Sequence, residues 1–222
     1  SRIMAGESRQ RIFHIYLTGS TGQIRQEIPQ KEEAVLKYSE LETPRLVLRG
    51  WRESDLEDLF AYCSEPEVGP AAGWQPHADK TVSRGVLRQF MEAGEVWAIV
   101  DRCSRRVIGS IGLHEEKRRD NANCRMLGYA LGKEHWGKGL MTEAVRAVLR
   151  YAFETLCLEM VTVYHYPFNH RSSRVIEKCG FHYEGTLRRG TTRFDGQVLD
   201  NVCYSLLREE YEALCAKEAA RQ

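Results

Sequence analysis

The chain has 222 residues, which is long enough for one α/β domain with a full hydrophobic core and a short extension. Lys and Arg total 32 against 31 Asp and Glu, and the net charge of +1 provides no general attraction to nucleic acid or to an acidic membrane surface. No apolar run is long enough to span a membrane and no signal-peptide pattern is present, so we expect a cytoplasmic protein.

The seven cysteines form neither a C-x-x-C pair nor the Cys/His spacing of a zinc site, so we expect no bound metal. Three of them, Cys157, Cys179 and Cys203, lie in apolar runs and are predicted to be buried, reduced thiols.

The first forty residues differ in character from the rest. The segment "RIFHIYLTG" at 11–19 has the composition of a strand, and "PQKEEAVLKYSE" at 29–40 favours a short helix. The intervening "STGQ" is typical of a turn. We therefore interpret residues 1–40 as an N-terminal extension of unknown role and residues 41–222 as the folded domain.

The segments after Leu41 alternate between patterns typical of helices and of strands. Helices are predicted at 53–65, 81–93, 140–156, 169–179 and 208–222. Strands are predicted at 45–51, 96–101, 106–114, 125–132, 160–166, 182–194 and 197–207. This order indicates one α/β domain of the α+β kind, with a mixed, largely antiparallel central sheet flanked by helices rather than a doubly wound sheet.

Gly137 and Gly139 flank a lysine just before the strongest helical pattern, although glycine in a helix costs about 0.5–1 kcal/mol. The G-x-x-x-x-G-K pattern from Gly132 is incomplete, because Gly139 replaces the Ser or Thr that binds Mg²⁺. A dinucleotide fingerprint fails because Thr142 stands where its third glycine belongs. Two interpretations remain: backbone N–H groups of 137–142 bind a pyrophosphate at the helix N-terminus, or a tight turn requires glycine.

A second motif, N-H-R-S-S-R-V-I-E-K-C-G-F, occupies residues 169–181. Together with "LGYALGKEHWGKGLMTEA" at 127–144, it resembles the RimJ/RimL branch (ribosomal-protein-alanine/serine N-acetyltransferase-like) of the GNAT N-acetyltransferase superfamily. The segments "TPRLVLR" at 43–49, "VIGSIGLH" at 107–114 and D-x-x-x-Y-S-L-L at 200–207 also look like that branch. The resemblance spans about residues 41–215 and implies the GNAT fold.

The resemblance implies that acetyl-CoA is the cosubstrate, that no metal takes part, and that the acetyl group passes to a primary amine by direct attack. In such proteins the glycine loop holds the pyrophosphate and the pantetheine arm lies beside the strand that contains "GYALG". Glu134 departs from the Gln or Arg that often precedes the first glycine by three residues. Carried over, the cofactor-binding residues are Leu131, Trp136, Gly137, Lys138, Gly139, Leu140, Met141, Thr142, Asn169 and Arg174.

The resemblance also implies the catalytic residues. Ser172 corresponds to a serine proposed to protonate the departing thiolate, and Asn169 would contact the cofactor, although Asn169 is also a good helix N-cap. A glutamate common in the superfamily corresponds to Met126 or a neighbour, so no base is evident there. His114, Glu115 and Glu116 are alternative bases, or else simply solvated; His165, Tyr166 and Glu184 are weaker ones. We predict Ser172, Asn169 and Glu115 as catalytic residues.

We predict that Trp74 and His114 contact the acceptor. The resemblance places His77 and Phe90 in the same acceptor pocket. A site without a strong base favours an α-amine, since at pH 7.4 roughly a quarter of such amines are neutral, against about one lysine in a thousand. The predicted acceptor is thus a protein or peptide N-terminus, in a monomer or homodimer that binds neither nucleic acid nor membrane directly. The alternatives are a small-molecule amine acetyltransferase, acting on an aminoglycoside, a polyamine or an amino-acid conjugate, and an inactive CoA-binding protein.

Overall fold

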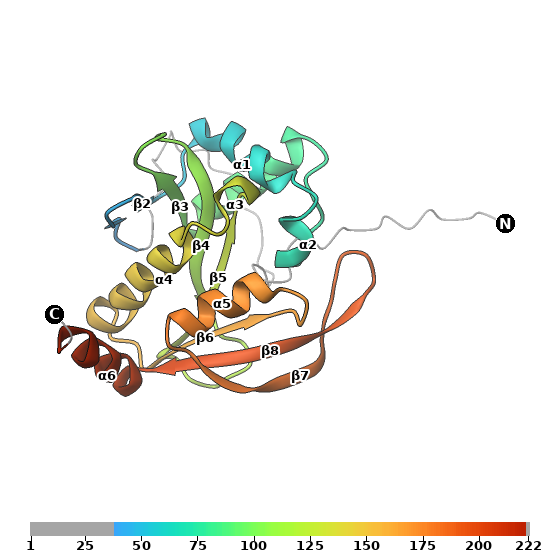
Figure 1. Ribbon diagram of the computed structural model, residues 1–222. Coiled ribbons are helices and arrows are strands. Elements are labelled where there is room, and N and C mark those ends of the chain that lie inside the picture. The colour runs from blue at the N-terminus through green and yellow to red at the C-terminus, as the bar shows by residue number, and fades with distance from the viewer. Residues whose placement is uncertain (1–37, 221–222) are drawn as a thin grey trace, which may run out of the picture.

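The computed structural model describes residues 38–220 of the chain (Figure 1). The strand predicted at 11–19 lies outside the described residues, as does most of the helix predicted at 29–40. The end of that segment, residues 38–40, is not helical and leads directly into the first strand. None of the described helices is long and apolar enough to cross a membrane.

A single eight-stranded sheet runs through the domain, in the order β1-β2-β3-β4-β5-β6-β8-β7. Its neighbouring strands pair antiparallel except β5 and β6, which are parallel. This confirms the mixed, largely antiparallel sheet. The strands are β1 Leu41–Glu42, β2 Leu46–Arg49, β3 Val96–Asp101, β4 Val107–Glu115, β5 Cys124–Leu131, β6 Met160–His165, β7 His182–Thr192 and β8 Val198–Leu207.

Helices cover both faces of the sheet, which Figure 1 shows with α4 and α5 next to each other. The predicted helices are confirmed with small changes of length, and the four-residue helix α2 is an addition that the sequence pattern did not predict. The helices are α1 Leu56–Cys63, α2 Gly69–Ala72, α3 Lys80–Ala93, α4 Leu140–Arg150, α5 His170–Lys178 and α6 Arg208–Ala219.

Two hydrophobic clusters lie on opposite faces of the sheet. Successive side chains of a strand point to opposite faces, so Trp97 and Ile99 of β3 join the cluster beneath α4 while Ala98 and Val100 join the one beneath α1 and α3. Burial on both faces explains why β3 reads as a continuous apolar run rather than an alternating one.

The predicted helix at 140–156 is formed by α4 and a π-helical turn, Tyr151–Thr155. The chain leaves this turn at Cys157, which has a positive φ of 53° and is exposed, so its predicted burial was wrong. Cys157 is exposed because it lies just after the end of a helix, although its neighbours in the sequence are apolar. Cys179 is buried as predicted, whereas Cys203 is only half-buried.

The folded domain includes residues just before β1. The ring of Tyr38 stacks on Trp97 at a centroid distance of 4.9 Å, and its hydroxyl donates a hydrogen bond to the Leu113 carbonyl at 3.0 Å. The amide of Ser39 donates to the Tyr151 hydroxyl at 3.1 Å. The division of the chain at residue 40 stays a prediction, but Tyr38 and Ser39, the first described residues, already contact the core.

Strands β5 and β6 separate part of the way along the sheet. They pair only between Cys124–Met126 and Met160–Thr162, after which β5 continues to Leu131 and β6 to His165 without further pairing to each other. Backbone groups on the facing edges are therefore available between the separated ends. This separation positions the site described next.

Candidate active site

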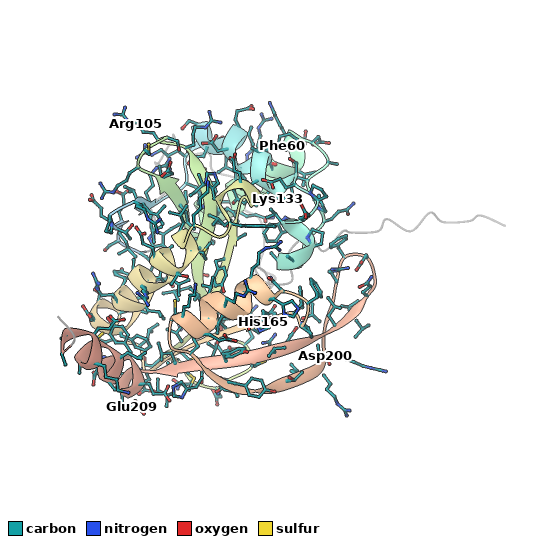
Figure 2. All side chains as sticks on the ribbon, viewed as in Figure 1. Phe60, Arg105, Lys133, His165, Asp200 and Glu209 are labelled. Atoms are coloured by element: carbon teal, nitrogen blue, oxygen red, sulfur yellow. The ribbon has the colours of Figure 1, made fainter. Side chains whose placement is uncertain are left out.

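A cavity of about 340 Å³ lies where β5 and β6 separate, between α2, the start of α4 and the start of α5. In Figure 2, Lys133 lies near the segment that precedes α4, and His165 lies at the end of β6 beside α5. Most of the site residues predicted from sequence line this cavity. They are Trp74, Leu131, Trp136, Gly137, Gly139, Leu140, Met141, Thr142, Asn169, Ser172 and Arg174.

Three predicted site residues do not line the cavity. The backbone carbonyl of Lys138 accepts a hydrogen bond from Arg45 outside the cavity. Glu115 is exposed at the end of β4. His114 is buried with its Nδ1 3.9 Å from Glu95 Oε2, and burial lowers its pKa to about 4. The structure therefore does not bring Glu115 or His114 together with Ser172 around the cavity, because β4 lies on the far side of β5 from it.

The loop before α4 has the backbone geometry of an anion site. Gly137 and Gly139 both have φ of +74°, a left-handed conformation that strains residues with a Cβ, and Gly139 is the N-cap of α4. The amides of the first helical turn, Leu140 to Thr142, have no acceptor within the helix and lie at its positive end. The loop thus fits a pyrophosphate through backbone groups, which explains the paired glycines.

Arg45, which directly precedes β2 and lies far from the loop only in sequence, holds this loop. Its Nη1 donates to the Lys138 carbonyl at 2.9 Å, and its Nε lies 2.7 Å from Glu143 Oε2. Glu143 Oε1 also accepts from Thr43 Oγ1 at 2.6 Å and from the Arg45 amide at 2.9 Å. Partial burial opposes ionisation, but these hydrogen bonds from Thr43 and Arg45 keep the pKa of Glu143 below its usual value.

The contact of Arg45 with Glu143 was missed from sequence, although both residues stood in segments that the analysis had singled out. Arg45 belongs to "TPRLVLR" and Glu143 to the T-E-A that follows the glycines. Because the two motifs are far apart in the sequence, the sequence did not indicate that they contact each other.

Trp136 and Arg171 close one side of the cavity. The indole Nε1 of Trp136 donates to the Leu131 carbonyl at 2.7 Å, which ties the glycine loop to the end of β5. The guanidinium of Arg171, from α5, lies 4.0 Å from the centroid of the Trp136 ring, a cation–π contact. Arg171 was also missed, because a cation on a short helix carries no distinguishing sequence signal.

Asn169 and Ser172 meet at the start of α5. Asn169 Oδ1 accepts from the Ser172 amide at 3.2 Å, which confirms the N-cap, and Asn169 Nδ2 donates to the Ala71 carbonyl of α2 at 3.0 Å. The buried Ser172 places its Oγ 2.8 Å from the hydroxyl of Tyr129 on β5. The cap therefore orders the cavity wall and joins α5 to α2.

The wall formed by α2 and its neighbours is apolar. Tyr166 is buried, stacks on Phe168 at a centroid distance of 5.6 Å, and has its pKa raised by burial. Its hydroxyl lies against Gly73, whose φ of +100° ends α2. This wall is lined by Val68, Ala71, Ala72, Trp74, Met126, Tyr164 and Tyr166.

The charge of the cavity lining is positive. Within residues 38–220, no aspartate or glutamate lines the cavity, while the lining includes Arg171, Arg174 and Lys178. Met126, which with its neighbours was the sequence-based candidate for the position of a superfamily glutamate, also lines the cavity. The chemistry of the site therefore relies on hydroxyl, amide and cationic groups.

The remaining base candidates are divided between the cavity and other places. His165 lines the cavity with its Nδ1 2.8 Å from the Tyr166 carbonyl, so that nitrogen carries the hydrogen in the neutral ring. Glu116 is buried away from the lining, where it accepts from Thr162 Oγ1 and the Arg118 amide. Glu184 pairs with Arg119.

The two residues that the sequence analysis placed near the acceptor pocket do not line the cavity either. Phe90 belongs to the core beneath α3. His77 is buried, with its Nδ1 2.7 Å from Ser83 Oγ.

Comparison with known protein families matches residues 45–182 to the acetyltransferase (GNAT) domain. An uncharacterized N-acetyltransferase, p20, of Bacillus licheniformis is 32% identical over 177 residues, covering 77% of this chain and 97% of the relative. The [ribosomal protein uS5]-alanine N-acetyltransferase of Escherichia coli is 29% identical over 178 residues, covering 75% and 89%. A crystal structure of spermidine N-acetyltransferase from Vibrio cholerae, with CoA and spermine, shares the fold with a TM-score of 0.64 at 19% identity, covering 76% and 99%.

Proposed function

The chain belongs to the GNAT acetyltransferase family and is an acetyl-CoA-dependent N-acetyltransferase, and we propose that its acceptor is the N-terminal α-amine of a protein or peptide. The observation that carries this proposal is the cavity lining, which contains no carboxylate of the described residues but several cations. A polyamine or an aminoglycoside carries several positive charges, and it would meet uncompensated repulsion here.

The residues that would hold acetyl-CoA follow from the geometry of the loop and the separated strands. The backbone amides from Gly137 to Thr142 would bind the pyrophosphate, and the edge of β5 up to Leu131 would bind the pantetheine arm. Bound acetyl-CoA supplies an acetyl group activated as a thioester. Asn169 and Ser172 border the part of the cavity where that thioester belongs.

The absence of a carboxylate base from the described lining is compatible with an α-amine. Such an amine has a pKa of about 7.7–8.0, so a substantial fraction is already neutral and nucleophilic near neutral pH. A lysine side chain, with a pKa of about 10.4, would depend on a base. The E. coli relative is named as an alanine N-acetyltransferase of a ribosomal protein, which agrees with this acceptor class.

The proposal is tested by incubating the protein and acetyl-CoA with four acceptors. Two are peptides of one sequence that contains lysine, one with a free and one with a blocked N-terminus; the others are spermidine and an aminoglycoside. We expect mass spectrometry to find acetylation on the free N-terminus alone. Ser172→Ala should slow this reaction, whereas Ser173→Ala, on the exposed side of α5, should not.

Two results would overturn the proposed acceptor. Acetylation of spermidine or the aminoglycoside without reaction at any peptide N-terminus would identify a small-molecule enzyme. Tight binding of acetyl-CoA without turnover of any amine class would favour the inactive CoA-binding protein instead.

A further inference from the structure

The hydroxyl groups of Tyr129 and Ser172 form a hydrogen bond between two elements of the cavity wall. Tyr129 Oη on β5 lies 2.8 Å from Ser172 Oγ on α5 and 3.4 Å from the Ser172 carbonyl. Both residues line the cavity. Tyr129 belongs to the "LGYALG" segment, and its hydroxyl has no part in the proposed function.

The Tyr129 phenol has one hydrogen and two acceptors within reach, Ser172 Oγ at 2.8 Å and the Ser172 carbonyl at 3.4 Å, and the shorter distance favours donation to Oγ. A phenol is more acidic than an aliphatic hydroxyl and is the better donor, whereas the serine oxygen has two lone pairs that can accept. Burial raises the pKa of Tyr129 far above its usual value, so the phenol keeps its proton at any pH of interest. A bond donated by Tyr129 leaves the hydrogen of Ser172 available for another acceptor.

We propose that Tyr129 is a positioning residue, which donates to Ser172 Oγ and thereby directs the Ser172 hydrogen into the cavity, toward the sulfur atom that leaves in acetyl transfer. This rests on the acetyl-CoA chemistry of the proposed function, but not on which amine is the acceptor. Ser172 is then a hydrogen-bond donor with a defined direction rather than a freely rotating hydroxyl.

The proton and electron balance needs no ionised tyrosine or serine. The acetyl C–S bond breaks, the sulfur leaves with the electron pair as a thiolate, and the amine nitrogen forms the new C–N bond. The nitrogen gives one proton to solvent, and the released thiolate takes one from solvent. Ser172 stabilises the thiolate by donating a hydrogen bond, while Tyr129 holds the serine oxygen and stays neutral throughout.

The test compares the binding of CoA and desulfo-CoA, which lacks the sulfur atom, by calorimetry between pH 6 and pH 9. Ser172 should favour the thiolate, so the wild type should prefer CoA increasingly as pH rises. Tyr129→Phe should reduce this preference at pH 9 by about tenfold, the scale of one hydrogen bond to a charged group. Affinity for desulfo-CoA should not change.

Three further variants distinguish positioning from simple fastening of α5 to β5. Ser172→Ala should lose the preference for CoA as Tyr129→Phe does, and the double variant should lose no more than either single variant. Ser172→Thr keeps a hydroxyl and should keep the preference. Tyr183→Phe is the matched control, because it removes an exposed phenol hydroxyl bonded to Thr186.

Equal weakening of CoA and desulfo-CoA binding by Tyr129→Phe, or additive losses in the double variant, would overturn the positioning role. Should Tyr129→Phe not fold, a difluorotyrosine at position 129 replaces it, since its more acidic hydroxyl is a stronger donor. That residue should raise the preference for CoA, and an unchanged or lower preference would contradict the proposal. If the variants changed the preference for CoA over desulfo-CoA as expected but no peptide was acetylated, only the proposed acceptor would be rejected.

Discussion

The two sides of the cavity are built in different ways. The phosphate side is one continuous segment, residues 131–142, whose shape depends on two glycines and the start of α4. The acceptor side combines α2, Met126 of β5, the end of β6 and the start of α5, which lie far apart in the chain. Backbone groups line the first side, and converging side chains form the second.

The two sides therefore differ in how much of their function can be inferred from the sequence. A site made of backbone amides needs only the residues that permit the backbone geometry, and those residues are consecutive. A site made of side chains depends on which elements pack together. Arg45 shows that even the continuous side requires one distant residue to hold it.

The largest effect is expected when the backbone of the phosphate side is altered. Gly139→Val places a β-branched residue at φ +74°, a conformation that such residues essentially avoid, so the loop backbone has to change. We expect the dissociation constant of acetyl-CoA, measured by calorimetry, to rise by about a hundredfold, equivalent to ~2.7 kcal/mol. Gly85→Ala, in an open position on α3, is the control and should leave binding unchanged. If Gly139→Val bound acetyl-CoA normally, the proposal that the loop backbone binds the pyrophosphate would be wrong.

The next effect concerns the pH stability of the loop that leads from the acceptor wall to α3. His77 in this loop is buried, its Nδ1 lies 2.7 Å from Ser83 Oγ, and burial lowers its pKa from 6.5 to about 4. Above pH 6.5 the ring is neutral in both states, so its contribution is fully present. Between about pH 6.5 and 4 only the unfolded chain takes up the proton, so stability falls as pH is lowered.

The loss through His77 should reach on the order of 2–3 kcal/mol at pH 4. Urea unfolding at several pH values measures it, and His77→Gln, which keeps a partner for Ser83, should make the profile flatter. His114, with a pKa also near 4, should account for part of the slope that remains. A His77→Gln profile as steep as that of the wild type would contradict the assignment.

Asn169→Ala tests how the separate segments of the acceptor side are joined. The change removes the N-cap of α5 and the hydrogen bond to Ala71 of α2. We expect the free energy of unfolding to fall by about 1–2 kcal/mol and the KM for the acceptor to rise. Ser173→Ala removes only an exposed bond to Glu177 and should stay within about 0.5 kcal/mol. Equal stabilities of the two variants would argue against a joining role for Asn169.

The smallest effect is expected when the ion pair between Arg45 and Glu143 is broken. Half of the Arg45 side chain is exposed, so solvent weakens the ion pair, and the loop keeps its glycine geometry without it. Glu143→Gln should raise the KM for acetyl-CoA by about two- to fivefold, on the scale of 0.5–1 kcal/mol, with little change in kcat. Lys80→Ala, which breaks an exposed pair with Glu57 away from the cavity, should leave that KM unchanged. If Glu143→Gln weakened acetyl-CoA binding more than Gly139→Val does, the side chains that hold the loop would matter more than its backbone geometry.

Local features of the chain were sufficient to predict the elements, and they suggested the loop that we propose binds the pyrophosphate. The composition and periodicity of local segments identified every described strand except the two-residue β1, and every described α-helix except α2. The glycines around Lys138 left two interpretations, an anion-binding loop or a tight turn, and both require the left-handed backbone conformation that the structure shows there. Such features depend on neighbouring residues, and neighbours are visible in sequence.

Trp74, Asn169 and Ser172 of the proposed acceptor side were predicted from sequence, but the contacts that join this side were decided by tertiary structure. No pattern indicated that α2 would meet Asn169, that Tyr129 would reach Ser172, or that Glu115 would lie away from them. The absence of acidic side chains from the described lining, which supports the proposed acceptor, is equally a consequence of packing. Side chains converge because the sheet separates between β5 and β6, and that separation arises from the pairing of whole strands rather than from any one segment of the sequence.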